Sequence, residues 1–343
     1  MARRLRRMPG VRWVEPNRRF HASSVRAPTD PLFTRQWALR SARVAPAWTT
    51  ATGGDVTVAV VDSGIDFSNP DLAGNVWTNP DEVAGNGVDD DANGFVDDTH
   101  GVDTVGHDGD PSDGLGHGTA VASLIGARGN NGFGISGVAW RVRLMPVKVL
   151  HDSGWGTTVT LITGLQYALA NGARIVNVSL NGSEQSQALD EAIRQAEARG
   201  ALVVTSAGND GANRDQVASY PASIASSAVL TVASSARGGA LGSESAYGAA
   251  VDIAAPGDGV TTSGLGGSFT TQSGTSFAAA HVSGAAALLA AARPRATAAQ
   301  LRSALVRSAR RDRRIDSWIG GGRLDVAAAL ERLKRPRAGR RSR

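Results

Sequence analysis

Five continuous apolar runs, separated by helix-like segments, constrain the fold of this chain more than any other feature of its sequence. From Asp55 onward these runs are apolar throughout instead of alternating with polar residues, which is typical of strands covered on both faces. We therefore predict an α/β fold with a mostly parallel central sheet flanked by helices. The predicted strands are 56–61, 143–150, 174–180, 201–206 and 228–233. The predicted helices include 117–127, 159–170, 187–199 and 276–292.

Polar residues stand at the ends of these predicted elements. Asp62, Ser179 and Asn209 fall at or just past the carboxyl ends of strands, and His117 and Ser276 begin helices. The carboxyl ends of parallel strands share one edge of the sheet, and ligand sites of open α/β sheets lie there. A helix that begins at Ser276 also brings the positive end of its dipole close to a carbonyl oxygen that becomes anionic during acyl transfer. We predict a site at this edge.

The segment Gly274–Gly284 indicates a serine nucleophile, because Ser276 lies between a glycine turn and an apolar helix of small residues. A serine hydroxyl is a poor nucleophile at neutral pH and needs an imidazole base, which in turn needs an orienting anion. His117, between two glycines, and Asp62, after an apolar strand, supply these groups. Taken singly, each residue also fits a helix cap, a turn or a plain loop.

In the order Asp, His, Ser, these motifs resemble those of the subtilisin-like serine proteases (subtilases, peptidase S8 family), and that order is the one established for subtilisin. The resemblance spans about residues 9–333 and implies a three-layer fold and a serine endopeptidase that hydrolyses peptide bonds in proteins. It implies that Ser276 forms an acyl-enzyme, that His117 is the general acid and base, and that Asp62 orients His117. Asn209 matches the amide of the oxyanion hole; as the first residue of an Asn-Asp pair it also fits an ordinary turn.

Two further segments resemble those that flank the substrate in this family. Peptides offer regularly spaced N–H and C=O groups to an exposed strand edge, so we expect recognition by backbone pairing. Both segments also fit surface turns. The residues concerned are Ser153, Gly154, Trp155, Ser179, Leu180, Asn181 and Gly182. Asn181 replaces a glycine of many relatives beside the pocket for the residue before the scissile bond, and Phe277 replaces a methionine that can be oxidised.

An acidic loop predicts a calcium site. Oxygen-bearing side chains at alternating positions precede a glycine, as at the start of a calcium loop. Position twelve is His100 instead of the bidentate glutamate, so the loop is no EF-hand, and a solvated acidic loop is the alternative. The expected ligands are Asp89, Asp91, Asn93 and Asp97.

A second calcium site rests on the family resemblance alone. It would clamp the N-terminal segment to the loop after the histidine helix. The alternative is that these are turn residues around Asn130-Asn131-Gly132. The matching positions are the side chains of Gln36, Asp71 and Asn131 with the carbonyl groups of Phe133 and Ile135. The structural Ca²⁺ expected here and at the acidic loop is the only cofactor implied.

The resemblance also implies a domain organisation. Residues 1–29 resemble the end of a subtilase propeptide, with processing between about Phe20 and Asp30, although a disordered arginine-rich arm is the alternative. Residues 30–333 form the predicted catalytic domain, which includes an acidic insertion at 81–113. Residues 334–343 are expected to form a basic, disordered tail.

Composition excludes several classes of protein. The chain has no cysteine, so it has no disulfide and no thiolate-bound metal, and we find no apolar run near the ~18 residues that cross a bilayer. The formal net charge is +5, but residues 44–292 carry nine basic residues against 25 acidic ones, a net charge of −16. We therefore expect protein and peptide substrates for a monomeric enzyme, without nucleic-acid or membrane partners.

Family resemblance implies secretion, although the chain as given shows no signal peptide, because no apolar region follows the basic residues 1–7 before Pro9. Two rival functions stay open at this point. One is a catalytically silent, subtilase-like protein that binds peptides. The other is a nucleic-acid-binding protein that acts through its basic ends, for which the sequence offers only two dispersed termini.

Overall fold

A seven-stranded parallel sheet forms the centre of the computed structural model, which describes residue 4 and residues 8–15 and 27–334. The strand order is β2-β3-β1-β4-β5-β6-β7, and every pairing is parallel, which confirms the predicted sheet. The strands are β1 (Gly53–Asp62), β2 (Val102–Asp103), β3 (Arg141–Lys148), β4 (Ile175–Val178), β5 (Leu202–Ser206), β6 (Val229–Ser235) and β7 (Ile253–Pro256). A separate antiparallel hairpin joins β8 (Val260–Ser263) to β9 (Phe269–Gln272).

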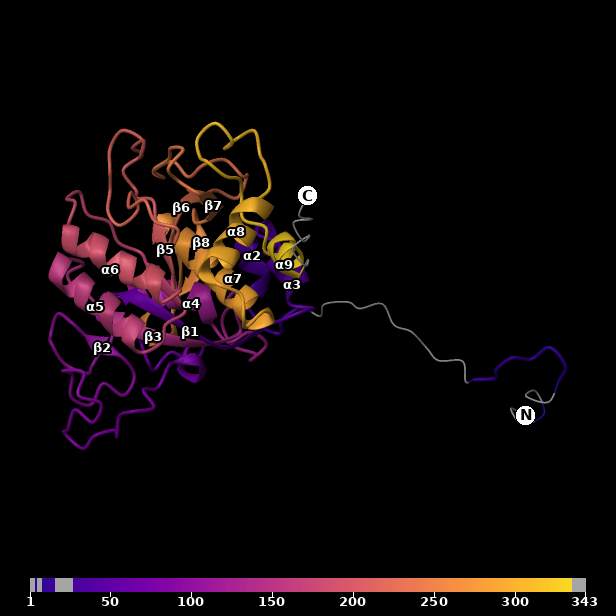
Figure 1. Ribbon diagram of the computed structural model, residues 1–343, viewed down its shortest axis with the longest axis horizontal. Helices are drawn as coiled ribbons and strands as arrows, with labels where there is room; N and C mark the ends of the chain where they lie inside the picture. The colour runs from indigo at the N-terminus through magenta and orange to yellow at the C-terminus, as the bar shows by residue number, and fades with distance from the viewer. Residues whose placement is uncertain (1–3, 5–7, 16–26, 335–343) are drawn as a thin grey trace, which may run out of the picture.

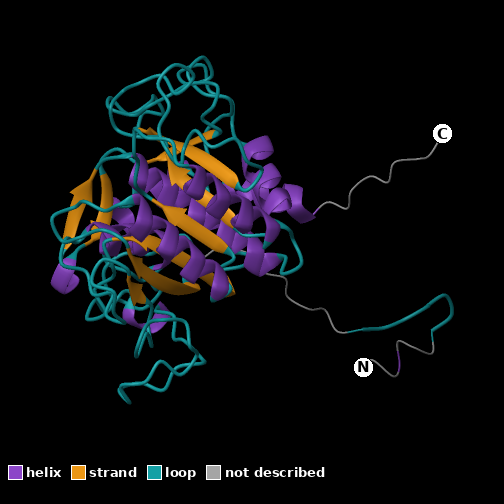
Figure 2. Ribbon diagram, turned by 60° about the vertical axis from the view of Figure 1, so that its left-hand side comes forward, coloured by secondary structure: helices purple, strands orange, loops and turns teal. Residues whose placement is uncertain are grey.

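Helices cover both faces of this sheet and complete three layers (Figures 1 and 2). One face carries α5 (Thr158–Ala170) and α6 (Gln187–Ala198). The other face carries α2 (Trp37–Ser41), α3 (Val44–Ala47), α4 (His117–Gly126), α7 (Thr275–Ala292), α8 (Ala298–Ser308) and α9 (Val326–Lys334). Three short 3₁₀ turns are η1 (Phe33–Arg35), η2 (Ala73–Asn75) and η3 (Leu265–Gly267).

Strand β1 shows why its sequence is apolar throughout. Val58 and Val60 belong to the core under α4 and α7, whereas Ala59 and Val61 belong to the core under α5 and α6. Side chains of a strand alternate between the two faces of a sheet, so a strand buried on both faces needs apolar residues at every position.

Helix α7 runs through the middle of the protein (Figure 1). By its length and composition this helix could cross a membrane. The sequence analysis did not anticipate this, because half of the helix is alanine. However, 89% of it is buried inside the protein, where it packs on β1, β4, β5, β6 and β7. A Cβ at Gly284 would lie 2.7 Å from Cβ of Val138 and 2.9 Å from O of Ile125, so small residues allow this close packing.

The chain between β1 and α4 forms long loops that extend from the sheet at the lower left of Figure 1. The acidic insertion predicted at 81–113 lies here, and β2 is its one regular strand. Of the sequence-based expectations, the processing region within residues 16–26 and the basic tail from residue 335 lie outside the described residues.

Candidate active site

Asp62 and His117 form a hydrogen-bonded pair at the carboxyl edge of the sheet. Asp62 is the last residue of β1 and is fully buried, and His117 is the first residue of α4, with 28% of its side chain exposed. Nδ1 of His117 lies 2.7 Å from Oδ1 of Asp62. A Cβ at Gly118 would lie 2.2 Å from O of Gly64, so glycine at position 118 lets α4 begin directly on the turn after β1.

The surroundings of His117 favour its charged form. Burial of the ring lowers its pKa, but the charge of Asp62, its hydrogen bond and the charge of Asp113 outweigh that effect, so the pKa of His117 is raised. A histidine in this setting is a stronger base than a free imidazole and can store a proton beside Asp62.

Asp113 is a second carboxylate at this site, which the sequence analysis missed. Its Oδ1 accepts from Ser63 Oγ at 2.8 Å and from the backbone N–H of Gly116 at 2.8 Å. Its Oδ2 accepts from the N–H and the hydroxyl of Thr119, in the first turn of α4. Asp113 therefore ties the turn after Asp62 to the start of the helix that carries His117.

Ser276 lies in the first turn of α7 and is 6% exposed. Its hydroxyl donates to O of Ser179 at 3.2 Å in this structure and makes no hydrogen bond to His117. The next residue, Phe277, places its ring centroid 5.6 Å from that of His117, so the two elements meet at this point. In free enzymes, catalytic hydrogen bonds are often long and tighten only with substrate bound.

Asn209 follows β5 and is anchored by the residue before Ser276. Its Oδ1 accepts from the N–H of Thr275 at 2.8 Å and from the Thr275 hydroxyl at 2.9 Å. These bonds fix the amide oxygen and leave the Nδ2 donor for a ligand beside Ser276. Glycine is needed at position 274, because its φ of 150° disfavours other residues and a Cβ there would lie 3.3 Å from this Nδ2.

Two adjoining cavities open at the site. A groove of about 800 Å³ is lined by His117 and Leu180 and by three apolar side chains at its rim, namely Leu115, Trp155 and Leu265, which are 39%, 55% and 38% exposed. A smaller pocket of about 430 Å³ has Ser276 and Asn209 among its lining residues.

The expected substrate segments differ in how they meet these cavities. Gly154 and Trp155 line the groove, but Ser153 does not, and its hydroxyl and N–H bond instead to Nδ1 of His151. The segment Ser179–Gly182 lines both cavities. Gly182 nevertheless exchanges two 2.8 Å backbone hydrogen bonds with Tyr220, so its own N–H and C=O are not available to pair with a peptide.

Asp71 is one of two buried carboxylates in the region of the second expected calcium site. Asp71 is fully buried and accepts from Nδ2 of Asn131 at 3.0 Å and from the N–H of Ile135 at 2.9 Å. Burial raises its pKa, and the charge of Asp30 raises it further. Asp30, absent from the sequence-based set, accepts from the N–H of Asn131 and is also buried. In contrast, the amide of Gln36 exchanges two 2.8 Å hydrogen bonds with the main chain of Ser136.

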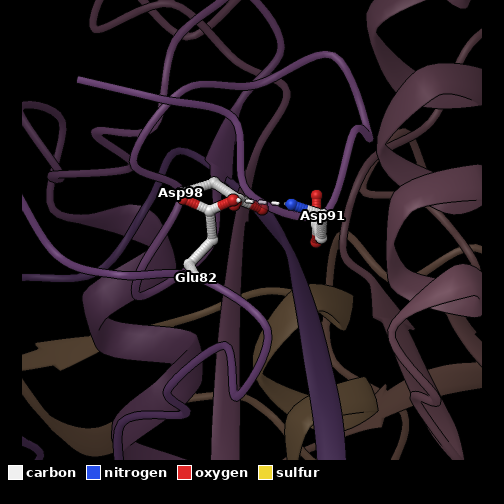
Figure 3. A group of neighbouring side chains, drawn as sticks. All are labelled: Glu82, Asp91 and Asp98. Carbon is white, nitrogen blue, oxygen red and sulfur yellow. Dashed lines mark hydrogen bonds between the residues drawn. The ribbon is translucent and has the colours of Figure 1, made fainter. Parts of the chain in front are cut away.

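The acidic loop gathers a different set of ligands from the one that its sequence pattern suggests. Carboxylate oxygens of Glu82, Asp91 and Asp98 lie within 4.8 Å of one another (Figure 3). Burial raises the pKa of Glu82 and of Asp98, and Oε2 of Glu82 is buried without a hydrogen-bond partner. Oxygen ligands without a nearby cation are the chemistry that Ca²⁺ would satisfy.

The other expected ligands of this loop form hydrogen bonds within the loop instead. Asp89 accepts from the N–H groups of Asn93 and Gly94, and Asp97 accepts from those of Asn86 and Gly87. The Asn93 amide donates to Asp91 and to Asp98. Only Asp91 of the predicted set thus belongs to the carboxylate cluster.

The parallel sheet covered by helices on both faces defines a protein of the α/β class, and Asp62, His117 and Ser276 lie at one edge of this sheet. The sequence model of the Subtilase family (peptidase S8) matches residues 53–322. Thermitase from Thermoactinomyces vulgaris is 32% identical, over 89% of this chain and 99% of thermitase. The minor extracellular protease Epr of Bacillus subtilis (strain 168) is 33% identical, over 87% of this chain and 43% of Epr.

Among solved structures, a protease from Pseudoalteromonas arctica PAMC 21717 superimposes with a TM-score of 0.75 at 31% identity. The match covers 90% of this chain and 100% of that one. The chain belongs to the subtilase family, as its motifs predict. It is a serine-type endopeptidase, and its substrates are proteins.

Proposed function

We propose that this chain cleaves peptide bonds through an acyl-enzyme on Ser276, with His117 as general acid and base and Asp62 as the residue that orients it. The observation that carries the proposal is the 2.7 Å bond between His117 and Asp62 at the edge where α7 presents Ser276. In this mechanism the hydroxyl of Ser276 leaves Ser179 and gives its proton to Nε2 of His117. The Asp62 bond holds Nδ1 protonated and keeps Nε2 as the acceptor.

The reaction then follows in two halves. Oγ of Ser276 attacks the scissile carbonyl carbon while His117 takes the serine proton, and His117 passes that proton to the departing amine. Water, deprotonated by His117, hydrolyses the ester and frees Ser276. The oxyanion of each tetrahedral intermediate would accept from Nδ2 of Asn209 and from the N–H of Ser276, a pair of donors that the Thr275 bonds hold in place.

Substrate would bind as an extended strand between the two segments that face the groove. Gly154 and Trp155 line one side, and Ser179–Asn181 line the other. The backbone of Gly182 is already paired with that of Tyr220, so the part of this segment that can pair with a substrate ends at Asn181. Pairing through the main chain does not depend on the side chains of the substrate, so it suits the cleavage of many sequences.

Replacement of the nucleophile tests the proposal. Ser276→Ala is expected to lower casein cleavage by about 10⁶-fold, the loss known for the serine of subtilisin itself. Ser227→Ala, which removes an exposed hydroxyl bound to Glu197, is the matched control and keeps its activity. Undiminished cleavage by Ser276→Ala would refute the assignment. Failure of the wild-type protein to react with a serine-directed phosphonate would favour a silent peptide-binding protein.

We also propose structural Ca²⁺ at two places. Asp30 and Asp71, with Asn131 and the carbonyl groups of Phe133 and Ile135, would hold one ion. Glu82, Asp91 and Asp98 would hold the other. The charge of Asp30 raises the pKa of Asp71, and that of Asp91 raises the pKa of Asp98. A cation at each place would offset this repulsion. Gln36, whose amide is bound to Ser136, is not included.

The remaining expectations stand as proposals. We infer that the enzyme is exported, which the name of the extracellular relative Epr supports. Residues 1–29 would then be the end of a propeptide and residues 30–333 a monomeric catalytic domain, with neither nucleic acid nor membrane as a partner.

A further inference from the structure

The pocket of about 430 Å³ beside Ser276 holds one particular side chain of the substrate, if the proposed catalytic roles are correct. Ser276 and Asn209 line this pocket, whereas His117 lines the neighbouring groove. Ser276 and Asn209 contact the acyl half of the scissile bond, and His117 serves the leaving amine. The side chain next to the attacked carbonyl, called P1, therefore enters this pocket.

A buried guanidinium forms part of its wall. The side chain of Arg214 is only 3% exposed and lines the pocket. Its Nε donates to O of Ala207 at 2.7 Å, its Nη1 to O of Val217 at 3.2 Å and its Nη2 to Oδ1 of Asp210 at 2.5 Å. Each nitrogen of the guanidinium thus has an acceptor, and the position of the charge is fixed.

Asp210 and Arg214 are the ionisable residues among those that line this pocket in the described part of the chain. Burial alone would raise the pKa of Asp210, but the hydrogen bond from Arg214 and its charge lower it, so the carboxylate is ionised and matched by one cation. The rest of the lining consists of serine, asparagine and small or aliphatic residues. The pocket therefore presents no net charge to a substrate.

The width of the pocket is fixed as well. Nδ2 of Asn181 donates to O of Ser206 at 2.9 Å, and Oδ1 of Asn181 accepts from the Ser206 hydroxyl at 2.8 Å. This pair ties the chain after β4 to the end of β5, and the two walls of the pocket continue from these points. Two hydrogen bonds between the walls oppose a change in the width of the pocket.

We propose that this endopeptidase selects uncharged P1 residues, because Arg214 cancels the charge of Asp210 inside the P1 pocket, and that Asn181 sets the width of this pocket by holding its walls together. Arg214 and Asp210 are then specificity-determining residues of the same site. Removal of either charge exposes the other, and the two single variants have opposite effects on charged substrates.

Arg214 also supports the segment that carries Asn209. This second role affects the choice of variants for the test. A Cβ at Gly208 would lie 2.2 Å from Nη2 of Arg214, so the guanidinium lies directly against this main chain. Substitution of Arg214 can therefore lower turnover for every substrate. Asp210 has a side chain 55% exposed, and its replacement removes the charge with less disturbance.

The test uses four peptides that differ only at P1, with Ala, Leu, Lys or Glu. We expect wild-type kcat/KM to favour Ala and Leu over both charged residues, with similar values for Lys and Glu. Asp210→Asn should raise the Glu-to-Lys ratio by about tenfold, as expected for one uncompensated charge a few ångströms away. Arg214→Gln should lower that ratio, and the double variant should restore it. Glu191→Gln on α6, the same loss of charge outside both cavities, should leave it unchanged.

The outcomes separate the possibilities. A wild-type preference of about tenfold for Lys or Glu, or a ratio that Asp210→Asn does not move, overturns the charge compensation. The Asp210→Asn result decides alone if Arg214→Gln fails to fold. Asn181→Gly should raise kcat/KM for a P1 Phe peptide relative to P1 Ala, and an unchanged ratio overturns the role of Asn181. A wild-type enzyme that cleaves neither these peptides nor casein would refute the proposed function, and this inference with it.

Discussion

Asp113 lies 50 residues after Ser63 in the chain, yet its Oδ1 accepts the Ser63 hydroxyl at 2.8 Å. Through that bond and those to Thr119, one carboxylate links the turn after Asp62 to the helix of His117. The same carboxylate adds a negative charge near the imidazole.

We predict that Asp113→Asn moves the acid limb of the kcat/KM profile to lower pH. In the proposed mechanism His117 must be neutral to accept the serine proton, and its raised pKa places the loss of activity at a pH above the usual value of 6.5. Without the charge of Asp113, the imidazolium is less favoured, so activity persists further into acid. Asp110→Asn in the same loop is the control, and an identical shift in both variants would contradict a specific role for Asp113.

Chelation is predicted to lower the melting temperature of Ser276→Ala protein, a background in which self-digestion cannot interfere. A ligand that binds only the native state stabilises it by about 2.7 kcal/mol at roughly one hundred times its Kd. Asp71→Asn should melt lower in calcium and respond less to EDTA. A melting curve that EDTA leaves unchanged would remove both proposed sites.

The acidic loop allows a sharper comparison. We expect Asp98→Asn to reduce the response to calcium, because Asp98 belongs to the carboxylate cluster with Glu82. Asp97→Asn removes the neighbouring charge, but that carboxylate binds the N–H groups of Asn86 and Gly87 instead. Calorimetric titration with Ca²⁺ measures both variants. Equal losses of affinity would argue against the cluster as the ligand set.

Phe277, next to the proposed nucleophile, predicts resistance to peroxide. Methionine is oxidised to a polar sulfoxide, whereas phenylalanine is not. Phe277→Met should therefore lose most of its activity in hydrogen peroxide under conditions in which the wild type retains it. Residual activity after timed exposure is the measurement, with Leu161→Met as a methionine placed farther from Ser276. Equal inactivation of wild type and Phe277→Met would show that another group is attacked.

His281 predicts a loss of stability in acid. It is fully buried in α7, and burial lowers its pKa to about 4. The unfolded chain binds the proton from about pH 6.5 downward, whereas the folded chain does not. Stability is therefore present above pH 6.5 and falls toward pH 4, by about 3 kcal/mol in all. Urea unfolding of Ser276→Ala protein across this range should show the slope, and His281→Gln should flatten it. A slope that His281→Gln leaves unchanged would assign the effect to other groups.

The sheet was predictable because its evidence is local. The continuous apolar runs that become β1, β3, β4, β5 and β6 carry their pattern within a few residues. Strand β7 was missed because four residues ended by Pro256 are too short to show a period. The 18-residue apolar helix α7 was placed correctly, although its suitability for a membrane by length and composition was not foreseen.

The calcium ligands show where local reasoning fails. Glu82 precedes the run of acidic residues at 89–91 and joins Asp91 and Asp98 only because the loop folds back. Asp89 and Asp97 matched the pattern better, but backbone N–H groups occupy them. Likewise, Asp30 accepts a hydrogen bond from the backbone N–H of Asn131, which lies 101 residues further along the chain. The side chain of Asn131 in turn donates to Asp71. A pattern of residue spacing within one segment cannot predict contacts between segments so far apart in the sequence.

Helix α7 also determines when the enzyme can first act. The helix that carries Ser276 packs against five strands, from β1 near the start of the domain to β7 close to α7 itself. Contacts between residues so distant along the chain form slowly, since closing long loops costs entropy before the contacts repay it. The serine therefore acquires its partners only when the sheet is complete. A chain whose sheet is incomplete therefore holds the residues of a protease without the packing that brings them together.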